Sequence, residues 1–313
     1  MKRKILITGG AGNVGGSLAR KLAADPDNYV VIVDNLSTGS RNKLPQNDFC
    51  NWRFIKADCN MMDELTPIMC AMSFDYVFHY AAVVGVKRTL EFPRMVLDDI
   101  KGIENVLVLS KSTGVKRVFY SSSSEVYGEP VEFPQREETT PLNSRLPYAI
   151  VKNLGESFFK SFHQEYGLQY TIFRFFNTYG PLQSTDFVVS RFIDLALRGE
   201  PLKIYGDGSQ TRTFCYVDDN LDTTHEILNK NIAINEVINI GSDVELAVLD
   251  LARMVINQLN SKSSIVHLPP LKEGDMTRRL PDIARMRSIL RRDLTPLDIG
   301  ICKTAEHLLR VRQ

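Results

Sequence analysis

The chain has 313 residues, of which 43% are hydrophobic and 24% are charged, and its formal net charge is +1. This length can bury a large core, whereas the near-zero net charge excludes a global field that would recruit nucleic acid or an anionic membrane. No apolar run reaches the roughly 20 residues of a membrane-spanning helix, and the N-terminus lacks the pattern of a signal peptide. The five cysteines are scattered without a CxxC pair, so we expect a reducing cytoplasm and neither a disulfide framework nor a metal site.

The first half of the chain alternates short apolar runs with segments of helical periodicity. Strands that alternate with helices indicate right-handed crossovers and an α/β fold with a doubly wound parallel sheet of the Rossmann type. The runs are almost all apolar, as expected for strands covered on both faces. The predicted strands are Ile5–Thr8, Tyr29–Asp34, Trp52–Lys56, Tyr76–His79, Arg117–Ser121 and Tyr170–Phe175, and the predicted helices include Val14–Ala24, Pro93–Thr113 and Pro147–Tyr166.

The pattern changes after about Asn177, where turns that contain glycine and proline become frequent. A short strand, Val237–Ile240, is predicted to return to the large sheet, and a helix, Val248–Asn260, is predicted to follow it. From Ser264 to the end we expect a strand, a loop and two short helices.

These patterns divide the chain into two parts. We expect a dinucleotide-binding Rossmann domain over residues 1–176, to which residues 214–260 partly return. Residues 177–213 and 261–313 are expected to form a smaller substrate-binding lobe at the carboxyl ends of the parallel strands, where ligands bind in open α/β sheets.

A glycine-rich turn lies between the first predicted strand and the first predicted helix. Gly10, Gly12 and Gly15 satisfy G-x-G-x-x-G, and Gly9, Gly12 and Gly15 satisfy the looser G-x-x-G-x-x-G. Such glycines permit a tight turn and let the backbone approach a pyrophosphate at the positive N-terminus of the helix.

The second predicted strand ends in Asp34, about twenty residues further on, where an acid binds the ribose hydroxyls of NAD and repels the 2′-phosphate of NADP. The cofactor is therefore predicted to be NAD, although Asp34 could instead cap a turn with Asn35. Asp58, after the third strand, is predicted to contact the adenine, with a simple turn residue as the alternative. The predicted cofactor-binding residues in this part of the chain are Gly9, Gly12, Asn13, Val14, Gly15, Asp34, Asn35 and Asp58.

Tyr148 and Lys152 are four residues apart in a helical segment, so they share one face. A free tyrosine has a pKa of about 10 and is a poor base near neutrality. A nearby ammonium and the positive nicotinamide ring favour the phenolate and should lower that pKa. Ser123 would hold the substrate oxygen by a hydrogen bond. The alternatives are a surface helix pair for Tyr148 and Lys152 and a polar strand end for the serine.

These features resemble the extended short-chain dehydrogenase/reductase family. The resemblance implies that Tyr148 removes the proton from a sugar 4-hydroxyl while hydride passes to NAD, and that Lys152 also holds the nicotinamide ribose. It also implies that Ala81, Tyr148 and Lys152 belong to the cofactor-binding residues. The family usually carries Asn-x-x-Gly before the catalytic strand, but this chain has Asp99-Ile100-Lys101-Gly102, so the role of that asparagine cannot be carried over. The resemblance rests on Gly9, Gly12, Gly15, Asp34, Asp58, His79, Ala81, Ala82, Ser123, Tyr148, Lys152, Arg174, Asn177, Tyr179–Pro181 and Tyr205–Arg212.

Glu125 bears on which reaction follows the first oxidation. It is predicted to lie on a strand end two residues after Ser123, so the two side chains are expected to face the same side. Family 4,6-dehydratases and UDP-glucuronate decarboxylases carry Glu there, whereas 4-epimerases usually carry a small residue. This favours a nucleotide-sugar 4,6-dehydratase, with an epimerase and a decarboxylase as alternatives. Against the decarboxylase, Leu182 follows Pro181 where those enzymes usually have Arg. A non-catalytic NAD-binding regulator remains an alternative of another class.

The remaining predictions concern the substrate and a partner subunit. By the resemblance, Arg212 and Arg279, the latter in the stretch 275–282, reach the two phosphates of a nucleotide sugar, which a guanidinium fork suits. Asn177, Tyr205 and Ser124 are predicted to contact the substrate. Family members form homodimers through a four-helix interface, so we expect a homodimer, with burial inside one chain as the alternative. The apolar residues on the corresponding helices include Val96, Ile100, Phe158, Phe159 and Phe162.

Overall fold

The structure, a computed structural model, describes residues 2–46, 50–270 and 278–312. Residues 275–277 of the stretch that carries Arg279 therefore lie outside the described residues. The chain divides into two compact units. Unit 1 comprises Met1–Val126, Ser144–Phe175 and Thr224–Ile238, and unit 2 comprises Tyr127–Asn143, Phe176–Thr223 and Asn239–Gln313.

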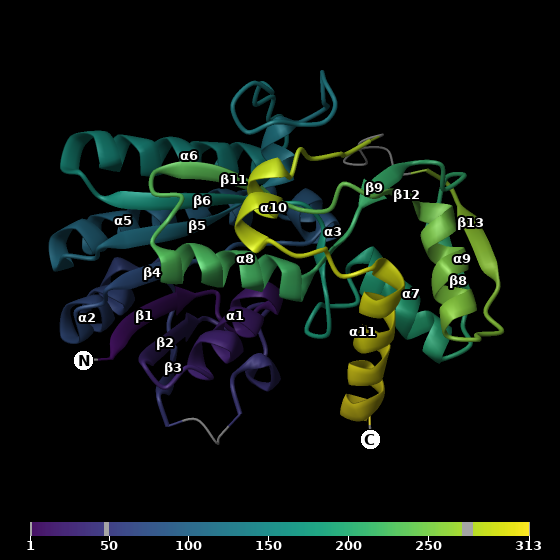
Figure 1. The fold of residues 1–313 in the computed structure, drawn as a ribbon, viewed down its shortest axis with the longest axis horizontal. Helices are drawn as coiled ribbons and strands as arrows, with labels where there is room; N and C mark the ends of the chain where they lie inside the picture. Colours follow the sequence, from purple (N-terminus) through teal and green to yellow (C-terminus); the bar gives the residue numbers. More distant parts are fainter. Residues whose placement is uncertain (1, 47–49, 271–277, 313) are drawn as a thin grey trace. The chain divides into compact units, whose positions relative to one another are not determined.

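Unit 1 is built on a seven-stranded sheet with the order β11-β6-β5-β4-β1-β2-β3 (Figure 1). Strands β1 to β6 pair in parallel with their neighbours. The predicted Rossmann-type fold is therefore confirmed, and β11 returns to the sheet beside β6 as predicted. The strands are β1 (Arg3–Thr8), β2 (Asn28–Asp34), β3 (Trp52–Lys56), β4 (Tyr76–His79), β5 (Arg117–Ser123), β6 (Gln169–Phe175) and β11 (Glu236–Ile240).

Helices cover both faces of this sheet. On one face, α5 (Asp99–Thr113) packs between α2 (Met62–Met72) and α6 (Pro147–Tyr166) and buries a core that includes Leu6 and Val31. Alternate strand residues point to the opposite face, where α1 (Asn13–Ala23) packs on β1 and β2.

The prediction of one continuous helix over Pro93–Thr113 was wrong in one respect, because the helix is interrupted. It forms α4 (Pro93–Leu97) and α5 (Asp99–Thr113), with Asp98 between them. At this point the amide of Lys101 donates to the carbonyl of Asp98, three residues back, which is the tighter 3₁₀ pattern rather than the α pattern. The interruption makes Asp99 the first residue of α5. A short helix, α3 (Val86–Glu91), precedes α4.

Unit 2 contains three small two-stranded sheets and a group of helices in which α7, α9 and α11 pack on one another. Helix α7 was not predicted, because the turns that flank it dominated the pattern, and α11 has 16 residues rather than being short. The elements are β7 (Thr178–Tyr179), α7 (Val188–Leu197), β8 (Leu202–Tyr205), β9 (Thr211–Thr213), β10 (Cys215–Tyr216), β12 (Glu245–Ala247), α9 (Val248–Gln258), β13 (Ile265–Leu268), α10 (Ala284–Leu290) and α11 (Leu297–Arg312). Helix α8 (Val217–Lys230) begins in unit 2 and ends in unit 1. Within the described ranges, none of the helices has the length and hydropathy to cross a membrane.

Candidate active site

The glycine-rich turn lies at the point where the strand order of the sheet reverses. Gly9 follows β1 with a positive φ of 69°, and a Cβ there would lie 2.5 Å from the backbone nitrogen of Ala81, which follows β4. Only glycine allows the two strand ends to approach so closely. The predicted cofactor residues Gly9 and Ala81 are thus neighbours at the carboxyl ends of β1 and β4, the usual ligand position in a sheet of this type.

The N-terminus of α1 fits a pyrophosphate. Gly12 caps the helix without a side-chain hydrogen bond, and the first turn contains no acidic residue that would repel an anion. The first amides of a helix lack intrahelical partners and attract negative charge. The side-chain oxygen of Asn13 is buried without a hydrogen-bond partner in the described part of the chain, so it can accept a hydrogen bond from a bound group. These features support a dinucleotide at Gly12, Asn13, Val14 and Gly15.

Asp34, at the end of β2, holds the neighbouring turn together. Its carboxylate accepts hydrogen bonds from the amides of Ala11, at 2.9 Å, and Leu36, at 2.8 Å. It therefore does cap a turn, which was the alternative interpretation. Each carboxylate oxygen can accept a second hydrogen bond, so the predicted ribose contact is compatible with the turn. The side-chain amide of Asn35 donates to the Asp58 carboxylate at 3.0 Å, which brings these two predicted cofactor residues together.

Lys152 lies at the centre of the predicted catalytic group. Its side chain is buried, and Nζ donates to the carbonyl oxygen of Ser121 at 2.6 Å. Nζ also lies 5.8 Å from the centre of the Tyr148 ring, one turn earlier in α6, and 5.0 Å from that of Tyr120. The structure therefore brings Tyr148 and Lys152 to the end of β5, as a shared helix face predicts.

Burial controls the charge of this lysine. The loss of solvent lowers the pKa of Lys152 to about 8, and the negative charge of Asp99 opposes that shift. Next to it, burial lowers the pKa of His79 to about 3, so this imidazole is neutral at physiological pH. Its Nδ1 is 2.8 Å from the hydroxyl of Thr8.

The serine-rich end of β5 leads directly into a short 3₁₀ helix, η2 (Ser124–Tyr127). Ser123 is the last residue of the strand, and its hydroxyl accepts a hydrogen bond from the amide of Glu125 at 3.2 Å. The expectation that Glu125 lies on the strand end is wrong, because the strand stops at Ser123. Strand alternation therefore does not determine where Glu125 points. Ser124 is buried and Glu125 is half-buried.

A buried ion pair supports the strand that carries these serines. Arg174 in β6 makes two hydrogen bonds to Glu156 in α6, at 2.9 and 2.7 Å, and Ser122 donates to the same carboxylate at 2.6 Å. Sequence reasoning named Arg174 only as part of a motif and missed Glu156. It also missed the bonds of Ser121 and the placement of Asp99 near Lys152. The one sequence feature that pointed to Asp99 was its difference from the asparagine that the family usually carries at this position.

Of the predicted substrate residues, Ser124 belongs to unit 1, and Asn177, Tyr205, Arg212 and Arg279 belong to unit 2. The side-chain amide of Asn177 donates to the carbonyl of Thr213 at 3.0 Å, next to Arg212 in β9. Tyr205 ends β8, and its carbonyl accepts a hydrogen bond from Gln210 at 3.2 Å.

The stretch that carries Arg279 is tied to the strand pair that carries Arg212. Arg278 makes two hydrogen bonds to Glu245, at 2.6 and 2.8 Å, and Glu245 lies in β12, which pairs with β9. Arg278 thus forms a local ion pair, while the neighbouring Arg279 is buried. This connection supports the prediction that Arg212 and Arg279 serve one ligand.

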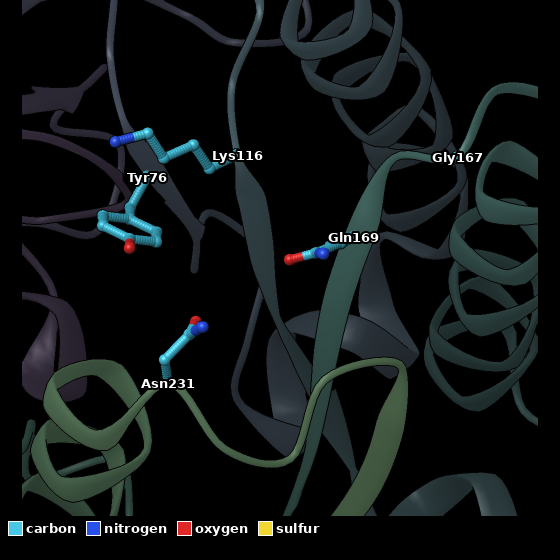
Figure 2. A pocket seen from close by; sticks show the side chains of 5 residues that line it. All are labelled: Tyr76, Lys116, Gly167, Gln169 and Asn231. Carbon is cyan, nitrogen blue, oxygen red and sulfur yellow. The ribbon is translucent and has the colours of Figure 1, made fainter.

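A shallow pocket of about 370 Å³ lies elsewhere on unit 1 (Figure 2). It is lined by Tyr76, Lys116, Gly167, Gln169 and Asn231. Tyr76 and Gln169 are the first residues of β4 and β6, so the pocket lies at the amino ends of the strands. Lys116 is engaged by Asp75 at 2.8 Å. The pocket is therefore at the opposite end of the sheet from the glycine-rich turn and the catalytic group.

This chain is a dinucleotide-dependent enzyme of the short-chain dehydrogenase/reductase type, as defined by its fold, its glycine-rich turn and its tyrosine–lysine pair. A model of the NAD dependent epimerase/dehydratase family matches residues 5–241, and the chain belongs to this family. NAD is the cofactor of the family.

Three known proteins that catalyse different reactions resemble the chain along nearly its whole length. A UDP-N-acetyl-α-D-glucosaminuronate decarboxylase from Bacillus cytotoxicus is 35% identical, covering 92% of each chain. The crystal structure of a UDP-glucose 4-epimerase with UDP-glucose from Thermotoga maritima is 32% identical, with a TM-score of 0.92 and coverage of 99% of this chain and 100% of that one. The dTDP-glucose 4,6-dehydratase of Streptomyces venezuelae, with NAD bound, is 28% identical, with a TM-score of 0.90 and coverage of 99% and 98%.

Proposed function

We propose that this protein oxidises a nucleotide sugar transiently at C4 and that Tyr148, Lys152 and Ser123 carry this step. The observation that carries the proposal is the buried Lys152, whose Nζ bonds to the Ser121 carbonyl at 2.6 Å beside the Tyr148 ring. A buried ammonium is costly unless it is used or paired. A surface helix pair, the alternative interpretation of Tyr148 and Lys152, does not account for it.

Each side chain has a distinct role in this proposal. Tyr148 accepts the proton of the sugar 4-hydroxyl, and the Lys152 ammonium stabilises the phenolate that makes this possible. Ser123 donates a hydrogen bond to the C4 oxygen and orients it. When bound, NAD accepts the hydride from C4 and later returns it. Lys152 also binds the nicotinamide ribose, and the α1 N-terminus with Asp34 holds the remainder of the cofactor.

We further propose that Glu125 makes the overall reaction a 4,6-elimination. Once C4 is a ketone, the proton on C5 is acidic, and the Glu125 carboxylate removes it. The C5–C6 double bond forms as the C6 hydroxyl takes that proton from Glu125 and leaves as water. Tyr148 releases to solvent the proton that it took from the 4-hydroxyl, and a proton from solvent is added at C5 as the hydride is added at C6, which gives a 4-keto-6-deoxy sugar. The backbone amide of Glu125 donates to Ser123 Oγ, so the two residues are neighbours where β5 ends.

A second candidate is a 4-epimerase, and the 32% identity to the Thermotoga maritima epimerase favours it. In an epimerase the ketone is reduced from its other face, and Glu125 has no chemical task. A decarboxylase is supported by the 35% identity to the Bacillus cytotoxicus enzyme. There the same ketone would allow carbon dioxide to leave, and Glu125 could protonate C5.

The diphosphate of the substrate is proposed to bind Arg212 and Arg279, with Asn177, Tyr205 and Ser124 as further contacts. Because the net charge of the chain is only +1, an anionic ligand must be held by local cations of this kind. The ion pair between Arg278 and Glu245 supports this assignment, because it fixes the position of the neighbouring Arg279 relative to β12.

We also propose a homodimer through α4, α5 and α6. Two of the residues that suggested this interface, Val96 and Phe159, are buried within the chain and cannot contribute to it. Exposed apolar residues nevertheless lie on the contacting helices α4 and α6, namely Met95, Leu97, Ile150 and Leu154. Light scattering of the purified protein tests the dimer, and a monomeric mass would contradict it.

The reaction is tested by mass spectrometry of nucleotide sugars incubated with the enzyme and NAD. The panel contains UDP-, dTDP- and GDP-glucose, UDP-N-acetylglucosamine, GDP-mannose and UDP-glucuronate. A product lighter by one water supports the dehydratase and identifies its substrate. An unchanged mass with altered retention supports the epimerase, and loss of carbon dioxide from UDP-glucuronate supports the decarboxylase.

A further inference from the structure

Asp99 begins α5, which packs on α6, the helix that carries Tyr148 and Lys152, although it belongs to neither the cofactor motif nor the tyrosine–lysine pair. It is the first residue of α5, and its carboxylate accepts a hydrogen bond from the amide of Val83 at 2.7 Å. Val83 lies in the loop after β4, two residues beyond Ala81. The side-chain amide of Asn60 bonds to the same carboxylate. Asp99 is therefore held by the two loops that follow β3 and β4.

The surroundings of Asp99 leave little freedom to move. Any side chain in place of Gly102, one turn further along α5, would collide with the side-chain oxygen of Asn60 and lie 3.1 Å from the sulfur of Cys59. Asn105 in turn donates to the carbonyl of Cys59 at 3.0 Å. The first turns of α5 are thus packed closely against the loop after β3.

The charges of Asp99 and Lys152 act on one another. Burial raises the pKa of the Asp99 carboxyl, while the amide of Val83 and the ammonium of Lys152 oppose this shift. In the opposite direction, Asp99 is the largest influence that keeps the Lys152 ammonium protonated against the effect of burial. Each group therefore favours the charged form of the other.

The other titratable groups around Lys152 supply no comparable negative charge. On β5 and α6, burial raises the pKa of Tyr120, and Glu156 is engaged by Arg174. On β4, His79 is neutral. The phenol of Tyr148 is the group that Lys152 is proposed to activate.

After β3, two further groups face Asp99. Burial raises the pKa of the Cys59 thiol, which keeps it protonated, and Asp58 raises the pKa of Asp99 by repulsion. Asp58 is half-buried and engaged by Asn35, by the amide of Asn60 and, through its own backbone amide, by Glu64. Asp99 is thus the carboxylate that acts most strongly on the catalytic lysine.

We propose that Asp99 is a positioning residue that keeps Lys152 charged during turnover and holds the loop after β4 against the catalytic group. This inference deepens the proposed function and rests on it, since the charged lysine matters because it activates Tyr148. The family pattern has a neutral asparagine at this position, so the negative charge that acts on Lys152 is a feature of this chain's own sequence. Loss of the charge is expected to restrict activity to lower pH, because Lys152 then loses its proton more easily.

The test compares Asp99→Asn with the wild-type enzyme. Asparagine can still accept the hydrogen bond from Val83 but carries no charge, so the variant isolates the electrostatic effect. We expect the alkaline limb of kcat/KM against pH to move down by on the order of one pH unit. The matched control is Asp98→Asn, which removes an exposed carboxylate paired with Lys101 at 2.9 Å and changes the net charge equally. Its profile should coincide with that of the wild type.

A second readout needs neither substrate nor cofactor. A buried lysine that deprotonates in the folded protein makes stability rise with pH, since the unfolded chain holds more protons. The rise in Tm of the ligand-free protein should begin about one pH unit lower in Asp99→Asn than in the wild type. In a Lys152→Met background, Asp99→Asn should leave the pH dependence of Tm unchanged between pH 7 and 9.5.

These outcomes separate the two proposals. If the wild-type enzyme converts no nucleotide sugar, the proposed function fails, yet the Tm series still measures the coupling of Asp99 to Lys152. If the wild type is active and the Asp99→Asn profiles of kcat/KM and Tm superimpose on those of the wild type, Asp99 has no such role. A shift of equal size in Asp98→Asn would also overturn the inference, because it would reflect net charge alone.

Discussion

The Nζ of Lys152 donates a hydrogen bond to the carbonyl oxygen of Ser121 at 2.6 Å, inside unit 1 and away from solvent. This bond joins α6, which carries Tyr148, to β5, which ends in Ser123. It therefore sets the tyrosine and the serine at one end of the sheet. The same end carries the glycine-rich turn after β1, so the cofactor and the proposed catalytic residues share one edge of the sheet.

Tyr148→Phe should abolish turnover while leaving the fold and the binding of NAD intact. The substitution removes only the phenolic oxygen, and a general base typically contributes a factor of about 10² to 10⁴ to the rate. Turnover and NAD affinity are measured on the same preparation. The control is Tyr166→Phe, an exposed tyrosine near the end of the same helix. Near-normal turnover in Tyr148→Phe would show that another group takes the proton.

Lys152→Met should change how stability depends on pH. The pKa of Lys152 is about 8 in the folded protein, below its ordinary value of 10.5, so the folded state releases its proton first. Between about pH 8 and 10.5 the unfolded chain holds the extra proton, and the stability of the wild type rises with pH by up to about 1.4 kcal/mol per unit from this group. The variant lacks this contribution. The difference in Tm between wild type and variant should therefore shift in favour of the wild type from pH 7.5 to 9.5, and a constant difference would contradict the lowered pKa.

Glu125→Gln should block the loss of water but permit oxidation at C4. The amide cannot accept the C5 proton, while Ser123, Tyr148 and Lys152 are unchanged. Product formation is followed by mass spectrometry, and the first step by the absorbance of NADH during a single turnover. Glu129→Gln, an exposed glutamate four residues further on, serves as the control. Unimpaired loss of water in Glu125→Gln would exclude this residue as the acid and base.

Glu156→Gln should destabilise the protein by about 3 kcal/mol or more, because it leaves the Arg174 guanidinium buried without its counter-charge. Both side chains are almost fully buried, at 1% and 2% exposure. Urea unfolding measures the change. The control, Asp250→Asn, removes an exposed partner of Arg253 and should cost less than about 1 kcal/mol. Equal effects in the two variants would mean that the buried pair contributes no more than a surface pair.

Much of the fold could be predicted from local patterns. The apolar runs Trp52–Lys56 and Tyr76–His79 coincide with β3 and β4, and Pro147–Tyr166 coincides with α6, because each is bounded by clear turn or helix-start signals. The break at Asp98 could not be predicted, because both flanking segments have helical periodicity and the interruption is a single residue. The end of β5 was placed too early, since a polar serine run gives no period that marks where a strand stops.

The candidate site was predictable only where its residues lie close in sequence. Tyr148 and Lys152 share a helix face, and the glycines of the turn share one motif. The electrostatic interaction of Asp99 with Lys152, and the ion pair of Glu156 with Arg174, depend on how α5, α6 and β6 pack. No local pattern specifies such pairs, although the departure of Asp99 from the family motif marked the position.

The most direct test of the proposed 4,6-elimination uses a nucleotide sugar with deuterium at C4, chosen from the panel by its conversion. Elimination should give a product one water lighter whose deuterium has moved from C4 to C6, because the hydride that leaves C4 returns after elimination. A product of unchanged mass that keeps its deuterium at C4 would contradict the elimination and leave Glu125 without a chemical role.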